Sequence, residues 1–217
     1  MSSREDILAR VRANLGAVVG DGARRVAARA QLAAKTEGPR PSLATGLVER
    51  FCTKAEAMAS TVDTVATLAE VPTAVARYLA ARGLPPRAIC WPEFAALDWA
   101  AAGVEVEARA ANGDDATGVT GCFCAIAETG TLMFASGPQT AATTSLLPET
   151  HIAVVPVSRI VPAMEEGFAL LRAACGEELP RAVNFVSGPS RTGDIEQTIV
   201  LGAHGPYRVH LLLVDGA

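Results

Sequence analysis

The stretch from Arg208 to Val214, Arg-Val-His-Leu-Leu-Leu-Val, constrains the fold more than any other part of the chain. It is almost wholly apolar and does not alternate apolar with polar residues, so both of its faces must be buried. Strands of this kind are typical of parallel sheets that are covered on both sides. Short strand-like runs alternate with helical patterns earlier in the chain, as βαβ units require. The sequence therefore predicts an α/β protein with a Rossmann-like, mostly parallel sheet.

The expected elements are short, and glycine, proline or polar residues separate them. Strands are expected at residues 61–65, 87–90, 104–106, 151–157, 182–186 and 208–214. Helices are expected at residues 71–79, 92–99 and 162–175. Residues 125–127 and 132–134 flank Glu-Thr-Gly-Thr, and this pattern predicts a hairpin or a sharp turn between two strands.

The first 44 residues differ from the rest and predict a helical arm with a linker. Four apolar residues share one helical face in residues 3–16. Residues 20–41 lack a clear apolar stripe, which indicates a linker or a loosely held helix. A further amphipathic helix is expected after Ser42. We expect two parts, an N-terminal helical arm and linker over residues 1–44 and an α/β domain over residues 45–217.

Charge is distributed unevenly along the chain. Residues 1–40 carry eight basic and four acidic side chains, whereas the other 177 residues carry 11 basic and 19 acidic ones. An acidic body argues against nucleic acid as a partner, because phosphate binding needs a basic face. The arm is expected to be a solvated helix and linker, or to dock on an acidic partner or on its own body.

The sequence indicates a cytoplasmic protein without a membrane span. No apolar stretch approaches the roughly 18 to 20 residues of a membrane helix, and the charged opening lacks the apolar block of a signal peptide. The five cysteines are odd in number and irregular in spacing, which favours reduced thiols. Their spacing predicts neither a metal site nor an iron–sulfur cluster, so no cofactor is expected in this chain.

The first candidate loop follows a predicted strand and contains Glu128, Thr129 and Gly130. In open α/β sheets, ligands collect beyond the carboxyl ends of the strands. A carboxylate beside two hydroxyls at such a turn is suited to act as a general base or to bind a hydroxyl or amine. The alternative is that Glu128 is a turn residue that hydrogen-bonds to nearby backbone.

The second candidate loop follows the strand at residues 182–186 and combines small residues with an arginine. Backbone N–H groups and a guanidinium that converge in this way make an anion or phosphate cradle. The loop lacks the lysine of a P-loop and the glycine spacing of a dinucleotide fingerprint, and a purely structural turn is the alternative. Its candidate ligand-binding residues are Gly188, Ser190, Arg191, Thr192, Asp194 and Glu196.

The third candidate loop places His204 between glycines and close to Pro206. This histidine is the one we expect to be exposed and able to donate or accept a proton. His151 begins an apolar strand and His210 lies inside another, so both are expected to be structural. Glu128 and His204 are therefore the candidate catalytic residues.

Four segments give the chain a family resemblance. They are Glu-Thr-Gly-Thr at 128–131, Leu-Pro-Glu-Thr-His-Ile at 147–152, Gly-Pro-Ser-Arg-Thr-Gly-Asp-Ile-Glu at 188–196 and Gly-Ala-His-Gly-Pro at 202–206. In this order they resemble the signature of the LUD (lactate utilisation) domain family. The resemblance runs over about residues 45–215.

The resemblance implies a fold of the sugar-phosphate isomerase and CoA-transferase-like type. It also implies a role, together with iron–sulfur partner proteins, in the oxidation of L-lactate to pyruvate. Because this chain has no cluster cysteines, the expected function is an accessory or subunit that binds a small anion near Arg191. Two alternatives stay open. One is a free-standing enzyme or binding protein that acts on a phosphorylated sugar, a CoA thioester or a folate, and the other is a scaffold.

Overall fold

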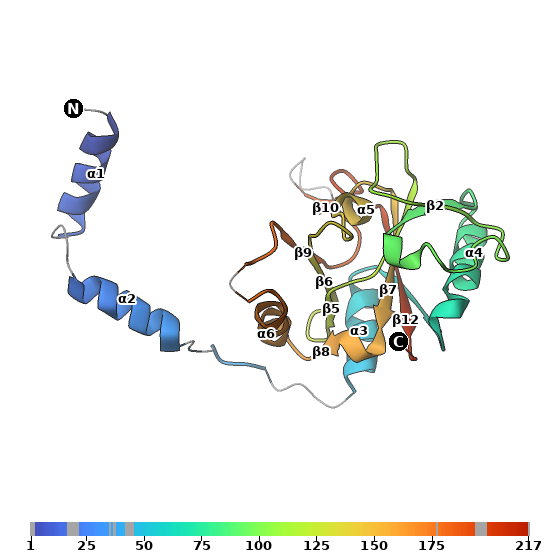
Figure 1. Cartoon of the computed structure of the whole chain (residues 1–217), viewed down its shortest axis with the longest axis horizontal. Coiled ribbons are helices and arrows are strands. Elements are labelled where there is room, and N and C mark those ends of the chain that lie inside the picture. Colours follow the sequence, from blue (N-terminus) through green and yellow to red (C-terminus); the bar gives the residue numbers. More distant parts are fainter. Residues whose placement is uncertain are drawn as a thin grey trace. The chain divides into compact units, whose positions relative to one another are not determined.

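A computed structural model describes residues 3–16, 22–34, 36, 38–41, 46–176, 178–193 and 199–216 (Figure 1). The chain divides into two units, Met1–Ser42 and Leu43–Ala217. The first unit contains helices α1 (Ser3–Asn14) and α2 (Gly22–Ala34). Neither helix buries a residue. The helix expected over residues 3–16 is confirmed, and α2 forms within the segment for which the sequence left linker and helix open.

The second unit is built around a six-stranded sheet in which every pair of neighbouring strands is parallel. Across the sheet the strands are β1 (Thr61–Val65), β12 (Arg208–Val214), β7 (Thr150–Pro156), β4 (Thr117–Thr120), β2 (Arg87–Cys90) and β3 (Glu105–Ala108). The α/β class and the parallel sheet predicted from the sequence are therefore confirmed. Strand β12 lies between β1 and β7, and six of its seven residues are buried, as its apolar run predicts.

A second, mixed sheet shares no strand with the first. Its strands are, in order, β8 (Ile160–Val161), β5 (Cys124–Ile126), β6 (Thr131–Ala135) and β9 (Val183–Val186). Strands β5 and β6 pair antiparallel, which confirms the predicted hairpin. Helix α6 (Met164–Cys175) contacts β5 and β8. Its start is fixed by the Ala163 N–H, which donates to the Glu166 carboxylate at 3.0 Å.

The remaining elements connect and cover these sheets. They are helices α3 (Leu47–Ala57), α4 (Val71–Ala81) and α5 (Thr143–Leu146), the 3₁₀ turns Leu68–Glu70, Pro92–Phe94 and Val157–Arg159, and the short strands β10 (Arg191–Thr192) and β11 (Val200–Leu201). The prediction of a helix over residues 92–99 is wrong beyond the first turn. The Asp98 carboxylate accepts the Ala101 N–H at 3.1 Å, so a local turn replaces a second helical turn.

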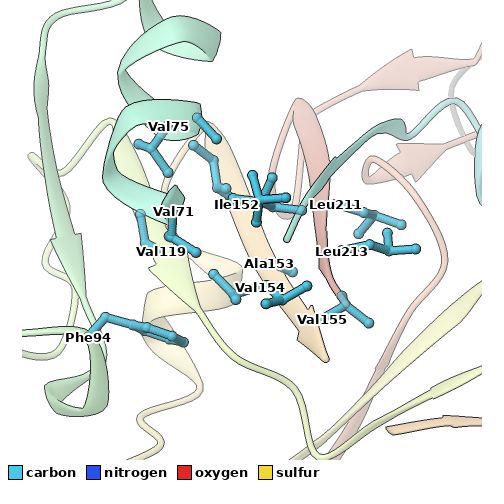
Figure 2. Close-up of a cluster of buried hydrophobic side chains, with 14 of the residues drawn as sticks. Val71, Val75, Phe94, Val119, Ile152, Ala153, Val154, Val155, Leu211 and Leu213 are labelled. Carbon is cyan, nitrogen blue, oxygen red and sulfur yellow. The ribbon is translucent and has the colours of Figure 1, made fainter. Parts of the chain in front are cut away.

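Parallel register assigns the side chains of the main sheet to two faces. Ile152 and Val119 lie in register and share the face that α4 covers, where Val71 and Val75 lie beside them (Figure 2). Leu211 and Leu213 pair with Ala153 and Val155 and point to the opposite face, toward the second sheet. Both faces of the central strands are therefore buried.

The two strand histidines are structural, as predicted. His151 is fully buried, and its Nε2 lies 2.8 Å from the Thr120 hydroxyl. That hydroxyl donates to the Gly121 carbonyl, so the imidazole is the donor to Thr120. His210 stacks on Tyr78 of α4, and its Nδ1 lies 2.9 Å from the Thr61 hydroxyl. Burial lowers the pKa of each histidine to about 4, so both are neutral near pH 7.

Candidate functional site

The turn at residues 127–131 connects β5 to β6 and packs on helix α3. A Cβ atom built on Gly130 would lie 2.3 Å from the Ala55 nitrogen, and Gly130 has a φ of +68°. Only glycine allows this close approach with that backbone conformation. The Glu128 N–H donates to the Pro162 carbonyl at 2.9 Å, and its side chain is half-buried. Thr129 is exposed and donates to the Thr131 hydroxyl at 2.7 Å.

The second loop approaches the same helix near its carboxyl end. A Cβ on Gly188 would lie 2.1 Å from the Met58 carbonyl oxygen, and φ is +76°. The Arg191 guanidinium donates to the same Met58 oxygen at 2.8 Å. A cation at this position stabilises the negative end of the helix dipole. The hydroxyls of Thr131 and Ser187 lie 2.5 Å apart and join this loop to the turn at 127–131.

The third loop pairs with the second. Strands β10 and β11 are antiparallel and place Thr192 opposite Val200. The Ser190 N–H donates to the Pro206 carbonyl at 2.9 Å, and the Ser190 carbonyl accepts the Gly202 N–H at 2.9 Å. His204 is exposed, as predicted. We call residues 127–131, 187–192 and 200–206 the loop cluster.

The position of the third loop corrects the sequence prediction. Residues 202–206 come just before β12, so they lie at the amino end of the main sheet rather than beyond a carboxyl end. Met58, which the second loop contacts, likewise precedes β1. The first two loops do lie beyond the carboxyl ends of strands, but these strands are β5 and β9 of the smaller sheet. The sequence showed which strand each loop adjoins but not which sheet that strand joins.

The structure thus brings most of the predicted site residues into one cluster. Gly130, Gly188 and Arg191 converge on α3. Asp194 and Glu196 lie outside the described residues. In the part of the chain that the structure describes, no hydrogen bond or ion pair joins the Glu128 or His204 side chain to another candidate residue.

A second group of chemically capable side chains lies at the carboxyl end of the main sheet. Glu93 follows β2, Cys122 follows β4 and Arg159 follows β7, and these three strands are neighbours. We call these three residues the carboxyl-edge cluster. A Cβ on Gly121 would lie 2.6 Å from Glu93 Oε1, so the carboxylate lies over the end of β4. Ile160 lies opposite Ala125, which places Arg159 beside Cys124.

Sequence reasoning missed this cluster, although one signal was present. Glu93 stands three residues after a correctly predicted parallel strand, where a carboxylate is expected to reach the ligand-binding edge. Strand β4 was not predicted, because Thr-Gly-Val-Thr has no apolar run. Its glycine is required by packing, since a Cβ on Gly118 would lie 2.2 Å from the Thr144 carbonyl oxygen.

The surroundings of the carboxyl-edge cluster raise the pKa values of its carboxyl and thiol groups. Desolvation raises the pKa of the Glu93 carboxyl above its usual value, although the residue reaches solvent. Burial raises the pKa of the Cys122 thiol far above its ordinary range, Cys124 and Glu93 add to the effect, and Arg159 opposes it. Burial also raises the pKa of Cys90 and of Cys124 to about 11. These thiols are protonated near pH 7.

A cavity of about 370 Å³ lies elsewhere, between β2, β3 and the loop that leads to β4. Its charged lining is largely engaged in holding that loop. Arg109 donates to both oxygens of Asp115 at 2.7 and 2.8 Å and to Glu107 at 2.7 Å. This network replaces the helix that usually connects two parallel strands.

Comparison with known proteins assigns the family. Residues 48–214 match the LUD domain family, and this span includes both sheets and every predicted site residue. The chain belongs to the LUD domain family. A lactate utilization protein C of Bacillus licheniformis is 38% identical over 130 residues, which are 58% of this chain and 53% of that protein. Lactate utilization protein C 1 of Bacillus mycoides is 43% identical over 100 residues, 45% of this chain and 43% of that protein.

This LUD domain protein therefore spans about half the length of the curated relatives it matches. A solved structure has the same fold: a DUF162 family protein from Deinococcus radiodurans matches with a TM-score of 0.62 and 25% sequence identity. The match covers 80% of this chain and 99% of that structure.

Two further findings on the LUD chain apply only to the residues that the structure describes. Among them, no three His, Cys, Asp or Glu side chains gather closely enough to hold a metal ion. No helix that the structure describes has the length and apolar character needed to cross a membrane.

Proposed function

We propose that this LUD domain protein is a cytoplasmic, partner-dependent component of a system that oxidises L-lactate to pyruvate. The observation that carries the proposal is the family match over residues 48–214, supported by relatives named lactate utilization protein C. The CoA-transferase-like fold type belongs to the same proposal. The parallel main sheet is compatible with that fold type.

Oxidation of lactate releases a pair of electrons and a pair of protons, so the electrons need an acceptor. We assign that task to iron–sulfur clusters in partner proteins. The spacing of the cysteines in this chain supports the assignment. None of the five cysteines stands in the Cys-x-x-Cys spacing that is typical of cluster ligands. This chain would then act on the substrate or on the partners.

The loop cluster is the proposed contact for a small anionic ligand. Arg191 uses one N–H on the Met58 carbonyl, and its exposed guanidinium has further donors. Backbone and hydroxyl groups of Thr129, Gly130, Gly188, Ser190 and Thr192 would shape the site. Within the loop cluster, we propose proton transfer for Glu128 and His204 alone. Asp194 and Glu196 complete the proposed ligand-binding set.

Lactate-dependent dye reduction in anaerobic extracts tests the proposal. A strain that lacks this chain should show no activity, and purified chain should restore it. The purified chain alone should not reduce the dye with lactate. Activity that persists without the chain would overturn the role in lactate oxidation. Turnover by the isolated chain would instead favour a free-standing enzyme.

Variants of the chain that is added back to the extract test the two proposed catalytic residues. Glu128→Gln preserves side-chain size, His204→Asn keeps a planar polar side chain, and both remove the acid–base function. We expect each to restore less than about a tenth of the activity, within the range that general acid–base catalysis supplies. Arg172→Gln, on the exposed face of α6, is the matched control and should restore full activity.

A further inference from the structure

Strand β9 forms one end of the second sheet, and only one of its two edges is paired. The order of that sheet is β8, β5, β6, β9 (Figure 1). The Ser136 N–H donates to the Ala182 carbonyl at 3.0 Å, just before β9 begins. Residues that bond to the neighbouring strand alternate along an antiparallel pair, so within β9 the backbone of Asn184 bonds to β6. Val183 and Phe185 therefore direct their N–H and C=O groups away from β6.

These outward backbone groups are open to another strand. Within the described part of the chain, no residue donates to or accepts from the outward groups of Val183 and Phe185. The Phe185 side chain is 39% exposed, and its ring lies 5.8 Å from that of Phe168 on α6, which is 36% exposed. An exposed aromatic pair beside an open strand edge is typical of a site where another protein surface binds.

The other edges of the two large sheets are protected against such pairing. Strand β3 carries Glu105 and Glu107, and β1 carries Asp63, which forms an ion pair with Arg77. Strand β8 is only two residues long. Charged residues and short strands are the devices by which proteins prevent sheets from joining edge to edge. Strand β9 reads Val-Asn-Phe-Val, without charge or proline, so its edge is the one of these four that is suited to accept a strand.

We infer that β9 pairs antiparallel with β9 of a second copy of this chain, across a two-fold axis at Asn184. The register follows from the alternation of the backbone groups. Val183 lies opposite Phe185 of the second copy, and each such pair exchanges two N–H···O=C hydrogen bonds. The symmetry produces this pair twice, once on each side of the axis. The second sheets of the two copies then form one continuous sheet.

The side chains of the strand are complementary to themselves in this register. Asn184 lies directly opposite the second copy's Asn184, in a non-hydrogen-bonded pair whose side chains are close. A carboxamide carries both donors and an acceptor, so two of them can bond to each other. Arg181, which precedes the strand, lies opposite Ser187 of the second copy. No like charges therefore meet across the axis, and like charges would oppose the pairing.

The exposed aromatic pair lies on the same side of the joined sheet in both copies. Paired residues of neighbouring strands point to one face, so Phe185 lies beside the second copy's Val183, next to Phe168 and α6. The four residues of β9 span only roughly 13 Å, which is short for an interface that needs roughly 800 Å² per partner. We therefore expect a reversible dimer with a Kd in roughly the micromolar range.

Sedimentation equilibrium of the full chain, from about 1 to 100 μM, tests the inference. The wild-type chain should show a monomer–dimer equilibrium. Val183→Pro removes an outward N–H and leaves the bonds to β6 in place, so it should weaken the dimer at least about tenfold. Phe185→Lys places a charge on the edge and should have a similar effect.

Leu170→Lys is the matched control for Phe185→Lys. Leu170 is 38% exposed, compared with 39% for Phe185. It follows Phe168 by two residues on α6, which places it roughly 200° around the helix from that ring. The same change to lysine at Leu170 should leave the dimer unchanged.

A disulfide tests the register itself. Asn184→Cys should form a bond between the two copies under mild oxidation, and mass spectrometry of the linked peptide identifies it. Phe185→Cys is the control. Its side chain faces Val183 of the second copy, and residue 185 of that copy is a diagonal neighbour, beyond the roughly 7 Å between Cα atoms that a disulfide spans. The native cysteines are present in both variants and give the same background.

Three results would overturn the inference. They are a wild-type chain that stays monomeric at every concentration, a dimer that Val183→Pro and Phe185→Lys leave unchanged, and a disulfide that forms in Phe185→Cys but not in Asn184→Cys. Circular dichroism and thermal midpoints establish that each variant is folded. Phe185→Lys keeps every backbone group, so it decides the question if Val183→Pro does not fold. None of these measurements depends on a role in lactate oxidation.

Discussion

At the amino end of the main sheet, Arg191 donates to the Met58 carbonyl, whereas at the carboxyl end Arg159 makes no hydrogen bond or ion pair within the described residues. The glycines differ in the same way. Gly188 lies against a backbone carbonyl, and Gly121 lies against the end of a flexible side chain. The amino end uses its special residues to hold loops on a helix, and the carboxyl end leaves charged groups available. A motif that stands out in the sequence can therefore be a packing motif.

The largest effect on stability is expected from a change of pH, because it protonates the histidines in the amino halves of β7 and β12. Burial lowers the pKa of His151 and of His210 to about 4, below the value near 6.5 of an unfolded histidine. The unfolded chain therefore binds protons first as the pH falls from about 6.5 toward 4. The stability that the two neutral histidines contribute is fully present above that window and should be lost progressively as the pH falls through it.

Urea unfolding measures this loss. Between about pH 7 and pH 5, each histidine should contribute about 2 kcal/mol of lost stability. His210→Asn should reduce the slope of stability against pH by about half, whatever it does to stability at neutral pH. An unchanged slope would show that His210 is not the group that titrates.

The next effect concerns the glycine that holds the second loop on α3. Gly188→Ala places a Cβ 2.1 Å from the Met58 oxygen at a φ of +76°, so backbone must move. We expect a loss of about 3 kcal/mol in the free energy of unfolding. Gly83→Ala is the matched control, since Gly83 has a φ of +63° with open space around it. It should cost only the strain of about 1 kcal/mol.

A pair of arginine substitutions compares the two ends directly. Arg191→Ala removes a donor from the Met58 carbonyl and should cost about 1 kcal/mol. Arg159→Ala should change stability by less than about 0.5 kcal/mol, as at a surface position without special contacts. Equal losses in denaturant unfolding would remove the distinction between the two ends.

A small effect on stability is also expected at Gly121. Its Cβ would meet only Glu93 Oε1 closely, and a flexible side chain can turn away. We expect Gly121→Ala to cost less than about 1 kcal/mol. Gly118→Ala, three residues earlier on β4, meets the Thr144 backbone oxygen at 2.2 Å and should cost several times more in the same assay.

Sequence reasoning succeeded where local pattern determines structure. The apolar run at 208–214 predicted a doubly buried strand, and the glycine in residues 128–131 predicted the β5–β6 turn. It failed where packing decides. Strand β4 consists of threonines, a glycine and one valine, and its neighbours rather than its own pattern make it a strand.

The same limit applies to the candidate site. The sequence indicated that Arg191 and His204 lie in glycine-rich loops, and the structure joins those loops through β10 and β11. It could not show that Arg191 would contact the Met58 carbonyl, because that contact joins residues far apart in the chain. Glu93 is informative only when the order of the strands is known. That order depends on long-range pairing that no local pattern encodes.

The position of β12 has a consequence for how the protein is made. Strand β1 pairs with β12 alone in the main sheet, yet the ribosome synthesises β1 early and β12 late. Until β12 emerges, β1 exposes unpaired backbone, and β7 lacks one neighbour. Strand edges exposed in this way are prone to aggregate, and chaperones bind such intermediates. Substitutions in β12 that slow its insertion should therefore reduce the yield of soluble protein in cells more than they reduce the stability of the purified fold.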